Sequence, residues 1–158
     1  SHPSGLIGKY FSDKTRNIFP IINQVAIGKK KKLRIFGNDY ATKDGTGVRD
    51  YIHVMDLCEG HLSALEFVED KESIFFNVNL GTGKGISVLE LVRTFEKVNN
   101  CNVPIQFVAR RKGDPSSVVA DNSKALALLK WKAKRNIEDM CIDGRRWHLN
   151  FINKFSRD

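Results

Sequence analysis

Five consecutive residues combine the side chains that could hold a diphosphate and a ribose. They are Arg110-Arg111-Lys112-Gly113-Asp114, in which three cations end at a glycine and a carboxylate. A guanidinium presents paired N–H donors whose geometry fits phosphate oxygens. A neighbouring carboxylate can accept hydrogen bonds from ribose hydroxyls. The spacing alone leaves a basic turn at the surface as an equally good interpretation.

Arg49 is the second candidate, because it lies between Val48 and Asp50-Tyr51 in a segment too apolar to be fully solvated. A partly buried arginine needs an anionic partner. A phosphate would satisfy that need, and Asp50 is the alternative partner within the chain.

A glycine-rich loop, residues 81–85, joins a predicted strand to a predicted helix, as in a dinucleotide-binding fingerprint. The spacing does not match, because position 86 is an isoleucine where the third glycine would stand. The Gly-Lys-Ser/Thr of a P-loop is also absent from the loop. We interpret the loop as a tight connection, with an anion site at the helix N-terminus as the alternative.

Histidine and cysteine spacing gives no sign of a catalytic or metal centre. The four histidines are scattered without metal-ligand spacing, and we interpret each as structural or surface. The three cysteines are odd in number and far apart, which indicates reduced thiols in a cytoplasmic protein. No nucleophile–base pair is recognisable. We therefore expect no catalytic residue and no metal site in this chain.

Composition indicates one soluble α/β domain over residues 1–158, with 41% hydrophobic and 28% charged residues. No apolar run approaches the roughly 20 residues of a membrane span, so we expect no membrane association.

The net charge of +8 favours anionic partners. Residues 29–32, four lysines, could contact nucleic acid. Because no aromatic residues are interleaved with them, a solvated loop is the preferred interpretation.

Periodicity predicts alternating helices and strands. A helix over residues 17–29 has Pro20 in its first turn and Gly28 at its end. Asp56 is predicted to cap a helix that carries apolar residues through position 68. The predicted strands cover residues 33–36, 74–80 and 104–109.

Three further helices have clear N-terminal signals. One follows a capping box made by Ser87 and Glu90. A short helix is predicted over residues 121–129, and Asn136 is predicted to cap the last helix. The sequence thus predicts a small mixed sheet with flanking helices.

Four blocks along nearly the whole chain resemble, in order, the motifs of UDP-glucose 4-epimerases, which are extended short-chain dehydrogenase/reductases. The blocks are His2-Pro3-Ser4-Gly5, residues 35–57, residues 79–91 and residues 110–125. The resemblance implies the C-terminal, substrate-binding portion of such an enzyme. The NAD-binding Rossmann domain and the catalytic Ser and Tyr-x-x-x-Lys pair are then expected to be absent, and this chain alone to be inactive. Apolar surface is expected to be exposed at residues 74–80 or 57–68.

The resemblance also implies a set of substrate-binding residues. Asn17 and Ile18 would lie by the pyrophosphate and uridine, and the backbone of Arg34-Ile35-Phe36 would hold uracil. The remaining assignments follow the same motifs: Arg49 and Arg111 clamp the diphosphate, Asp114 binds the ribose, and Val118 borders the sugar. Some family members have a tyrosine four residues after this aspartate, so Val118 leaves room for N-acetylated sugars.

The activity implied is NAD-dependent interconversion of UDP-glucose and UDP-galactose, in which the sugar is oxidised at C4, rotated and reduced on its other face. A homodimer is implied for the full-length enzyme. Two alternatives remain open. One is another UDP-sugar enzyme such as a UDP-glucuronate epimerase or decarboxylase, and the other is a non-catalytic nucleic-acid-binding module.

Overall fold

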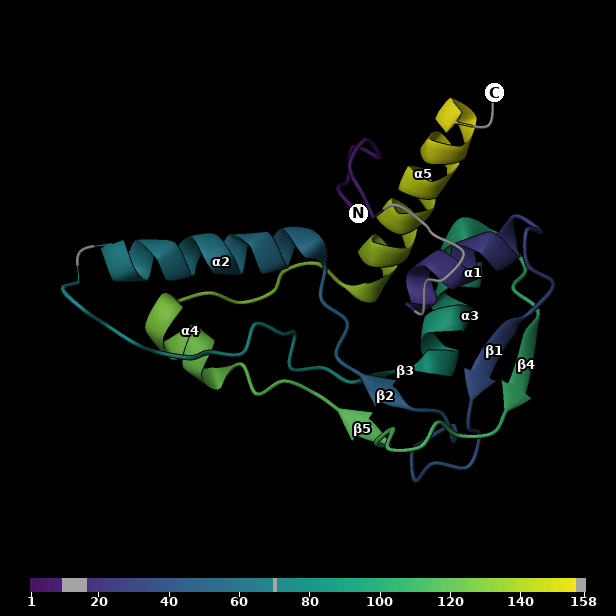
Figure 1. The fold of residues 1–158 in the computed structure, drawn as a ribbon, viewed down its shortest axis with the longest axis horizontal. Coiled ribbons are helices and arrows are strands. Elements are labelled where there is room, and N and C mark those ends of the chain that lie inside the picture. Colours follow the sequence, from purple (N-terminus) through teal and green to yellow (C-terminus); the bar gives the residue numbers. More distant parts are fainter. Residues whose placement is uncertain (10–16, 70, 156–158) are drawn as a thin grey trace.

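The computed structural model describes residues 1–9, 17–69 and 71–155 and has an α/β fold (Figure 1). The helices are α1 (Ile18–Ala26), α2 (Val54–Glu69), α3 (Val88–Asn99), α4 (Ser123–Leu129) and α5 (Ile137–Phe155). The strands are β1 (Leu33–Phe36), β2 (Val48–Arg49), β3 (Ile86–Ser87), β4 (Ile105–Val108) and β5 (Ser117–Val118). The predicted fold class is confirmed, with the strands divided between two small sheets.

Each sheet joins segments that are distant in the sequence. In the first sheet, β1 and β4 are parallel, with Ile35 opposite Phe107 and Phe36 opposite Val108. In the second sheet, β2 lies between β3, which is antiparallel to it, and β5, which is parallel. The first sheet is therefore parallel and the second is mixed, and the strands of the second sheet are not among those that the sequence predicts.

The main core lies between the first sheet and helices α1, α3 and α5. Its fully buried residues are Ile22, Val25, Leu33, Ile35, Leu91, Val92, Phe95, Val103 and Cys141. The predicted start of α3 is confirmed, because the Ser87 hydroxyl accepts a hydrogen bond from the Glu90 amide at 3.0 Å. Asn136 also caps α5 as predicted, and its side chain accepts from the Asp139 amide at 3.0 Å.

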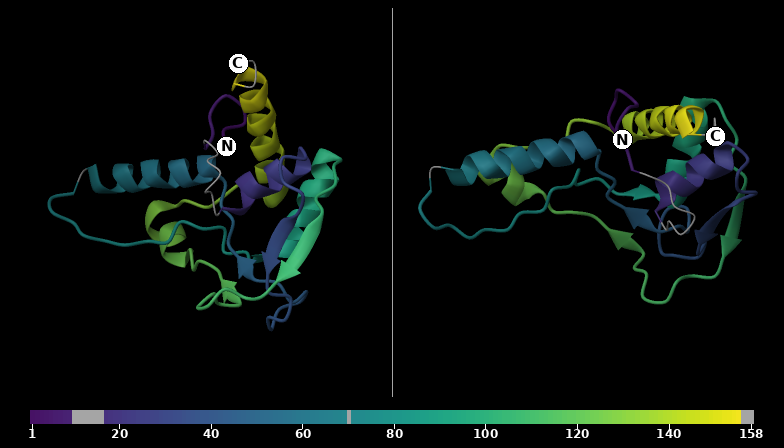
Figure 2. Two further views of the ribbon diagram at one scale, coloured as in Figure 1. Left: turned by 45° about the vertical axis from the view of Figure 1, so that its right-hand side comes forward. Right: turned by 45° about the horizontal axis from the view of Figure 1, so that its top comes forward.

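A second, smaller core surrounds Trp131 and connects α2 with α4. Helix α2 extends away from α1, α3 and α5 in every view (Figures 1 and 2). Across the described residues, no helix combines the length and apolar composition needed to cross a membrane.

The predicted N-cap of α2 is wrong. The helix begins before Asp56, and the Met55 amide donates to Nδ1 of His53 at 3.1 Å. The Asp56 side chain is fully buried and accepts from the backbone amides of Lys134 and Arg135 and from the Arg135 guanidinium at 2.5 Å. A buried carboxylate needs several charge-assisted partners, so Asp56 ties α2 to the segment before α5 instead of capping the helix.

The strand predicted over residues 74–80 is also wrong, because a strand requires a neighbour and none of the described residues forms a ladder with this segment. The alternation of side chains remains. Phe76, Val78 and Leu80 pack against the Trp131 core, whereas Phe75 is 95% exposed.

The apolar surface expected at this segment and on α2 is present. Leu62 and Leu65 of α2 are 57% and 65% exposed, and Ile74 is 43% exposed. Apolar side chains that are exposed to solvent together indicate a surface that contacts another protein or domain.

Candidate functional site

The carboxyl ends of β1 and β4 bring two guanidinium groups close to one aromatic ring. Because these strands are parallel and in register, Phe36 and the residues after Val108 lie at the same edge. The Arg111 guanidinium carbon lies 3.8 Å from the Phe36 ring centroid, and that of Arg34 lies 5.8 Å from it. The two segments that the sequence analysis assigned to uracil and to the diphosphate are therefore adjacent.

Arg110 fixes the loop beside this edge. Its guanidinium stacks 4.1 Å from the Tyr40 ring centroid and donates to the Asp39 carboxylate at 2.7 Å. This hydrogen bond lowers the pKa of Asp39. Gly37 has φ +89°, and a Cβ there would lie 2.5 Å from the Tyr40 ring. The interpretation of residues 110–114 as a surface turn thus holds for Arg110, which binds the chain itself.

Arg49 forms an ion pair with Asp114 through Nη2 and Oδ1. Its other terminal nitrogen donates to the Val48 carbonyl at 2.7 Å. The side chains of Arg49 and Asp114 are 27% and 32% exposed. The partner considered within the chain, Asp50, is wrong for Arg49.

Asp50 instead binds the loop at residues 81–85. Its Oδ1 accepts from the Thr82 amide at 3.0 Å and from the Thr82 hydroxyl at 2.5 Å. Its Oδ2 accepts from the amides of Gly83 at 3.0 Å and Ala120 at 3.3 Å. The backbone amides of the loop therefore do bind an anionic group, but that group is the Asp50 carboxylate of the same chain.

A cavity of about 410 Å³ lies at the carboxyl ends of β2 and β5, beside residues 79–81. Arg49 and Val118 are register partners in the second sheet, and both line this cavity together with Asp50 and Asn79. Val118 is 50% exposed. The arrangement places a cationic and a small apolar side chain on one wall of a space that a hexose could enter.

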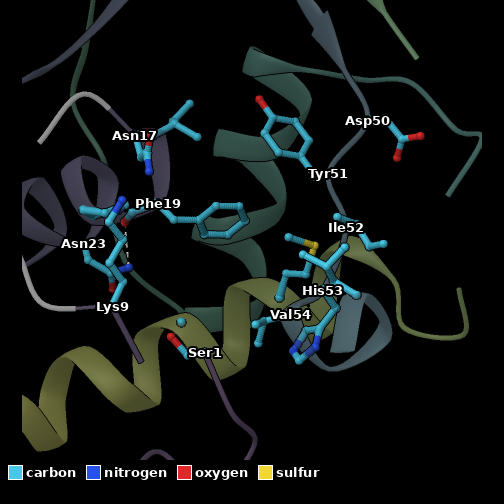
Figure 3. Close-up of a pocket in the computed structure, with 15 residues that line it drawn as sticks. Ser1, Lys9, Asn17, Phe19, Asn23, Asp50, Tyr51, Ile52, His53 and Val54 are labelled. Carbon is cyan, nitrogen blue, oxygen red and sulfur yellow. Dashed lines mark hydrogen bonds between the residues drawn. The ribbon is translucent and has the colours of Figure 1, made fainter. Parts of the chain in front are cut away.

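A second cavity of about 420 Å³ lies between α1, α5 and residues 50–57 (Figure 3). Asn17 and Ile18, at the start of α1, line it together with Asp50 and Tyr51. The Tyr51 ring meets Phe19 edge-on at 6.0 Å. Burial raises the pKa of Tyr51 to about 12, although the Arg49 charge opposes this, so Tyr51 is a neutral hydrogen-bonding group at physiological pH.

The nine predicted substrate residues thus fall into three neighbouring groups. Arg34, Ile35, Phe36 and Arg111 lie at the first sheet; Arg49, Asp114 and Val118 at the second; Asn17 and Ile18 at α1. The Ile35 side chain is 1% exposed and belongs to the core, so only its backbone is available to a ligand. Residues 49–51 connect the second group to the third.

His2, His53 and His61 form hydrogen bonds within the chain itself. His53 is buried, and its Nε2 lies 3.2 Å from the Asp143 carboxylate, which joins α2 to α5. Burial lowers the pKa of His53, and the N-terminal charge adds to this, while Asp143 opposes it. Among the described residues, no group of three or more His, Cys, Asp or Glu side chains could hold a metal ion.

Two features of the site escaped the sequence analysis. The first is the set of hydrogen bonds that the Asp50 carboxylate accepts from the backbone amides of residues 82, 83 and 120. The glycine-rich loop was the sequence feature that could have indicated them. The second is the contact of Arg110 with Asp39 and Tyr40, which joins residues 71 positions apart and has no local signal.

Comparisons with known proteins match nearly the whole chain. The family model described as GDP-mannose 4,6 dehydratase matches residues 2–143. The UDP-glucose 4-epimerase of Bacillus subtilis (strain 168) is 51% identical over 155 residues, which are 98% of this chain and 45% of the relative. That of Dictyostelium discoideum is 52% identical over 156 residues, 99% of this chain and 45% of the relative.

One solved structure extends the comparison to three dimensions. It is the UDP-glucose-4-epimerase of Stenotrophomonas maltophila with bound NAD and formylated UDP-arabinopyranose, with a TM-score of 0.93 and 45% identity. The match covers 98% of this chain and 46% of that one. The chain therefore spans less than half the length of the relatives it matches, and the resemblance seen in its motifs is confirmed.

Proposed function

The chain belongs to the GDP-mannose 4,6-dehydratase family, and from this membership we propose that it is the UDP-sugar-binding part of a UDP-glucose 4-epimerase. The observation that carries the proposal is the contact of Phe36 with Arg111 and of Arg49 with Asp114, which brings three segments together. An aromatic ring, two guanidinium groups and a carboxylate match, in order, a base, a diphosphate and a ribose.

Uracil is proposed to bind at the ends of β1 and β4, through the backbone of Arg34-Ile35-Phe36. Arg111 lies directly over Phe36, at 3.8 Å, and can reach a phosphate attached to a nucleoside held there. Arg49 and Asp114 would contact the diphosphate and the ribose. Asn17 and Ile18 would close the site from α1.

The sugar is proposed to occupy the cavity at the carboxyl ends of β2 and β5. Val118 is half exposed on its wall, so a substituent at C2 of the hexose has room. This supports N-acetylated UDP-hexoses as additional substrates. UDP-glucose and UDP-galactose are the primary pair.

NAD binding and the acid–base chemistry are proposed to belong to the part of the relatives that this chain does not match. The one loop here that resembles a dinucleotide motif already uses its amides to hold Asp50, so it does not fit the pyrophosphate of NAD. When bound, NAD accepts a hydride from C4 of the sugar and later returns it. The residues of this chain bind UDP while the sugar turns.

The exposed apolar surface supports the same division. Phe75, Leu62 and Leu65 are proposed to pack against the NAD-binding part. Assembly as a homodimer and a cytoplasmic location are proposed for the whole enzyme.

Two assays test the proposal. We expect UDP to raise the melting temperature of the 158-residue chain in proportion to the logarithm of its concentration, and duplex DNA to give no shift at moderate salt. The pure chain should not epimerise UDP-galactose, whereas a polypeptide that joins it to an NAD-binding part should. No UDP-dependent shift together with salt-resistant DNA binding would overturn the proposal in favour of a nucleic-acid-binding module.

A further inference from the structure

Asp50 is a partly buried carboxylate that connects three separate segments. It follows β2 directly, and its two oxygens accept from the amides of Thr82 and Gly83 in one segment and of Ala120 in another. The Thr82 hydroxyl adds a further donor to Oδ1. The Asp50 amide itself donates to the Val118 carbonyl at 3.1 Å.

These bonds matter because the second sheet is small. Strands β2, β3 and β5 are each two residues long, so the ladder contributes few backbone hydrogen bonds. Bonds to a carboxylate are charge-assisted and stronger than amide–carbonyl bonds. The Asp50 side chain therefore supplies a large share of what holds these strands in register.

The same bonds decide which partner Arg49 takes. Asp50 is the nearest carboxylate in sequence, yet each of its oxygens already accepts two hydrogen bonds from the loop segments. The Arg49 guanidinium is thereby left to Asp114 and to the cavity that it lines.

Close packing holds Asp50 in this place. A Cβ on Gly81 would lie 2.6 Å from Asp50 Oδ2 and 2.5 Å from the Ala120 Cβ. Asp50 also lines both cavities, so it lies between the space bordered by Val118 and the space bordered by Asn17.

We propose that Asp50 is a positioning residue for diphosphate binding: it fixes Arg49 relative to Val118 and Asp114 and, because its oxygens accept from the loop segments, does not itself compete with the ligand for the Arg49 guanidinium. The inference rests on the proposed function and deepens it. Asp50 should therefore affect the affinity for the diphosphate and not the affinity for uridine. The reason is that the proposed uracil site is on the first sheet, with which the Asp50 side chain forms none of its hydrogen bonds.

The test compares UDP with uridine, which lacks the diphosphate. Asp50→Asn keeps the shape of the side chain but replaces one acceptor with a donor. We expect calorimetric titration to give a Kd for UDP that rises about tenfold, the loss of one charge-assisted bond, with the Kd for uridine changed less than about twofold. Glu66→Gln, the same chemical change at an exposed position on α2, should alter neither value.

A second variant covers the case in which Asp50→Asn does not fold. Thr82→Val removes one donor to Asp50 and keeps the backbone, and it should raise the Kd for UDP roughly threefold without changing that for uridine. Equal losses for UDP and uridine would indicate a general structural effect and overturn the inference, as would variants that bind like the wild type. If the wild-type chain binds neither ligand, the proposed function fails and the inference fails with it.

Discussion

Arg49 and Asp114, which are 65 residues apart in sequence, form an ion pair at the carboxyl end of β2, the central strand of the second sheet. Each side chain is about one-third exposed or less, so the pair is screened from bulk water but open to a ligand. Asp114 compensates the Arg49 charge, and Asp50, adjacent in sequence, does not. The chain thus holds a guanidinium and a carboxylate side by side, as the two ends of a ribose diphosphate require.

Arg49→Lys tests the geometry of that pair. Lysine keeps the charge but lacks the planar fork that contacts two oxygens together. We expect the Kd for UDP to rise about tenfold, as measured by calorimetry. Lys31→Ala, which removes an exposed charge from the four-lysine run, serves as the control and should leave the Kd unchanged. A loss in Lys31→Ala with no loss in Arg49→Lys would mean that net charge alone attracts the ligand.

Val118→Tyr tests the assignment of the sugar cavity. A tyrosine on this wall fills space beside Arg49, so binding of UDP-N-acetylglucosamine should weaken by roughly tenfold while UDP-glucose changes little. Competition against a fluorescent UDP derivative measures both. Ser117→Tyr adds the same ring at the neighbouring exposed position and should not discriminate between the sugars. Parallel losses for both sugars in Val118→Tyr would contradict the assignment.

Asp56→Asn tests the polar contact between α2 and the segment before α5. The fully buried carboxylate binds two backbone amides and Arg135, and loss of its charge leaves these donors poorly matched. We expect urea unfolding to show a loss of about 3 kcal/mol in the free energy of unfolding. Glu59→Gln removes the more exposed partner of Arg135 and should cost less than about 1 kcal/mol. Similar losses in the free energy of unfolding for the two variants would contradict the claim that burial makes the Asp56 contacts the stronger ones.

The pH dependence of stability should report His148. Burial lowers the pKa of His148 to about 4, and Arg145 and Lys29 add to this, whereas the unfolded chain has the ordinary value of 6.5. The unfolded state therefore binds the proton first, and stability should fall as the pH falls from 6.5 towards 4. His148→Gln should flatten this dependence in urea unfolding, and His61→Gln, at an exposed position, should not. An unchanged slope in His148→Gln would contradict the assignment.

The elements that the sequence predicted well are those with local signals. β1 covers residues 33–36 as predicted, and α3 and α5 begin after the predicted capping residues, Ser87 and Asn136. Capping and side-chain periodicity act within a few residues, so a single sequence reveals them.

The failures involve partners distant in sequence. Asp56 has the residue type of an N-cap, yet its partners lie 78 and 79 residues away. The alternation over residues 74–80 is that of a strand, but strand formation depends on a neighbour, and none of the described residues supplies one. Within the site, the sequence motifs identified the arginines. They did not identify Asp114 as the partner of Arg49, because that pairing depends on Asp50 accepting hydrogen bonds from distant backbone amides.

An NMR titration of the isotope-labelled 158-residue chain with UDP tests the central claim most directly. The account predicts saturable chemical-shift changes that gather at the amides of residues 34–36, 49 and 110–114, with residues 29–32 unaffected. An Arg111→Met variant should lose most of these changes, because the guanidinium over Phe36 is then absent. Shifts confined to residues 29–32, or no saturable change with UDP, would contradict the account.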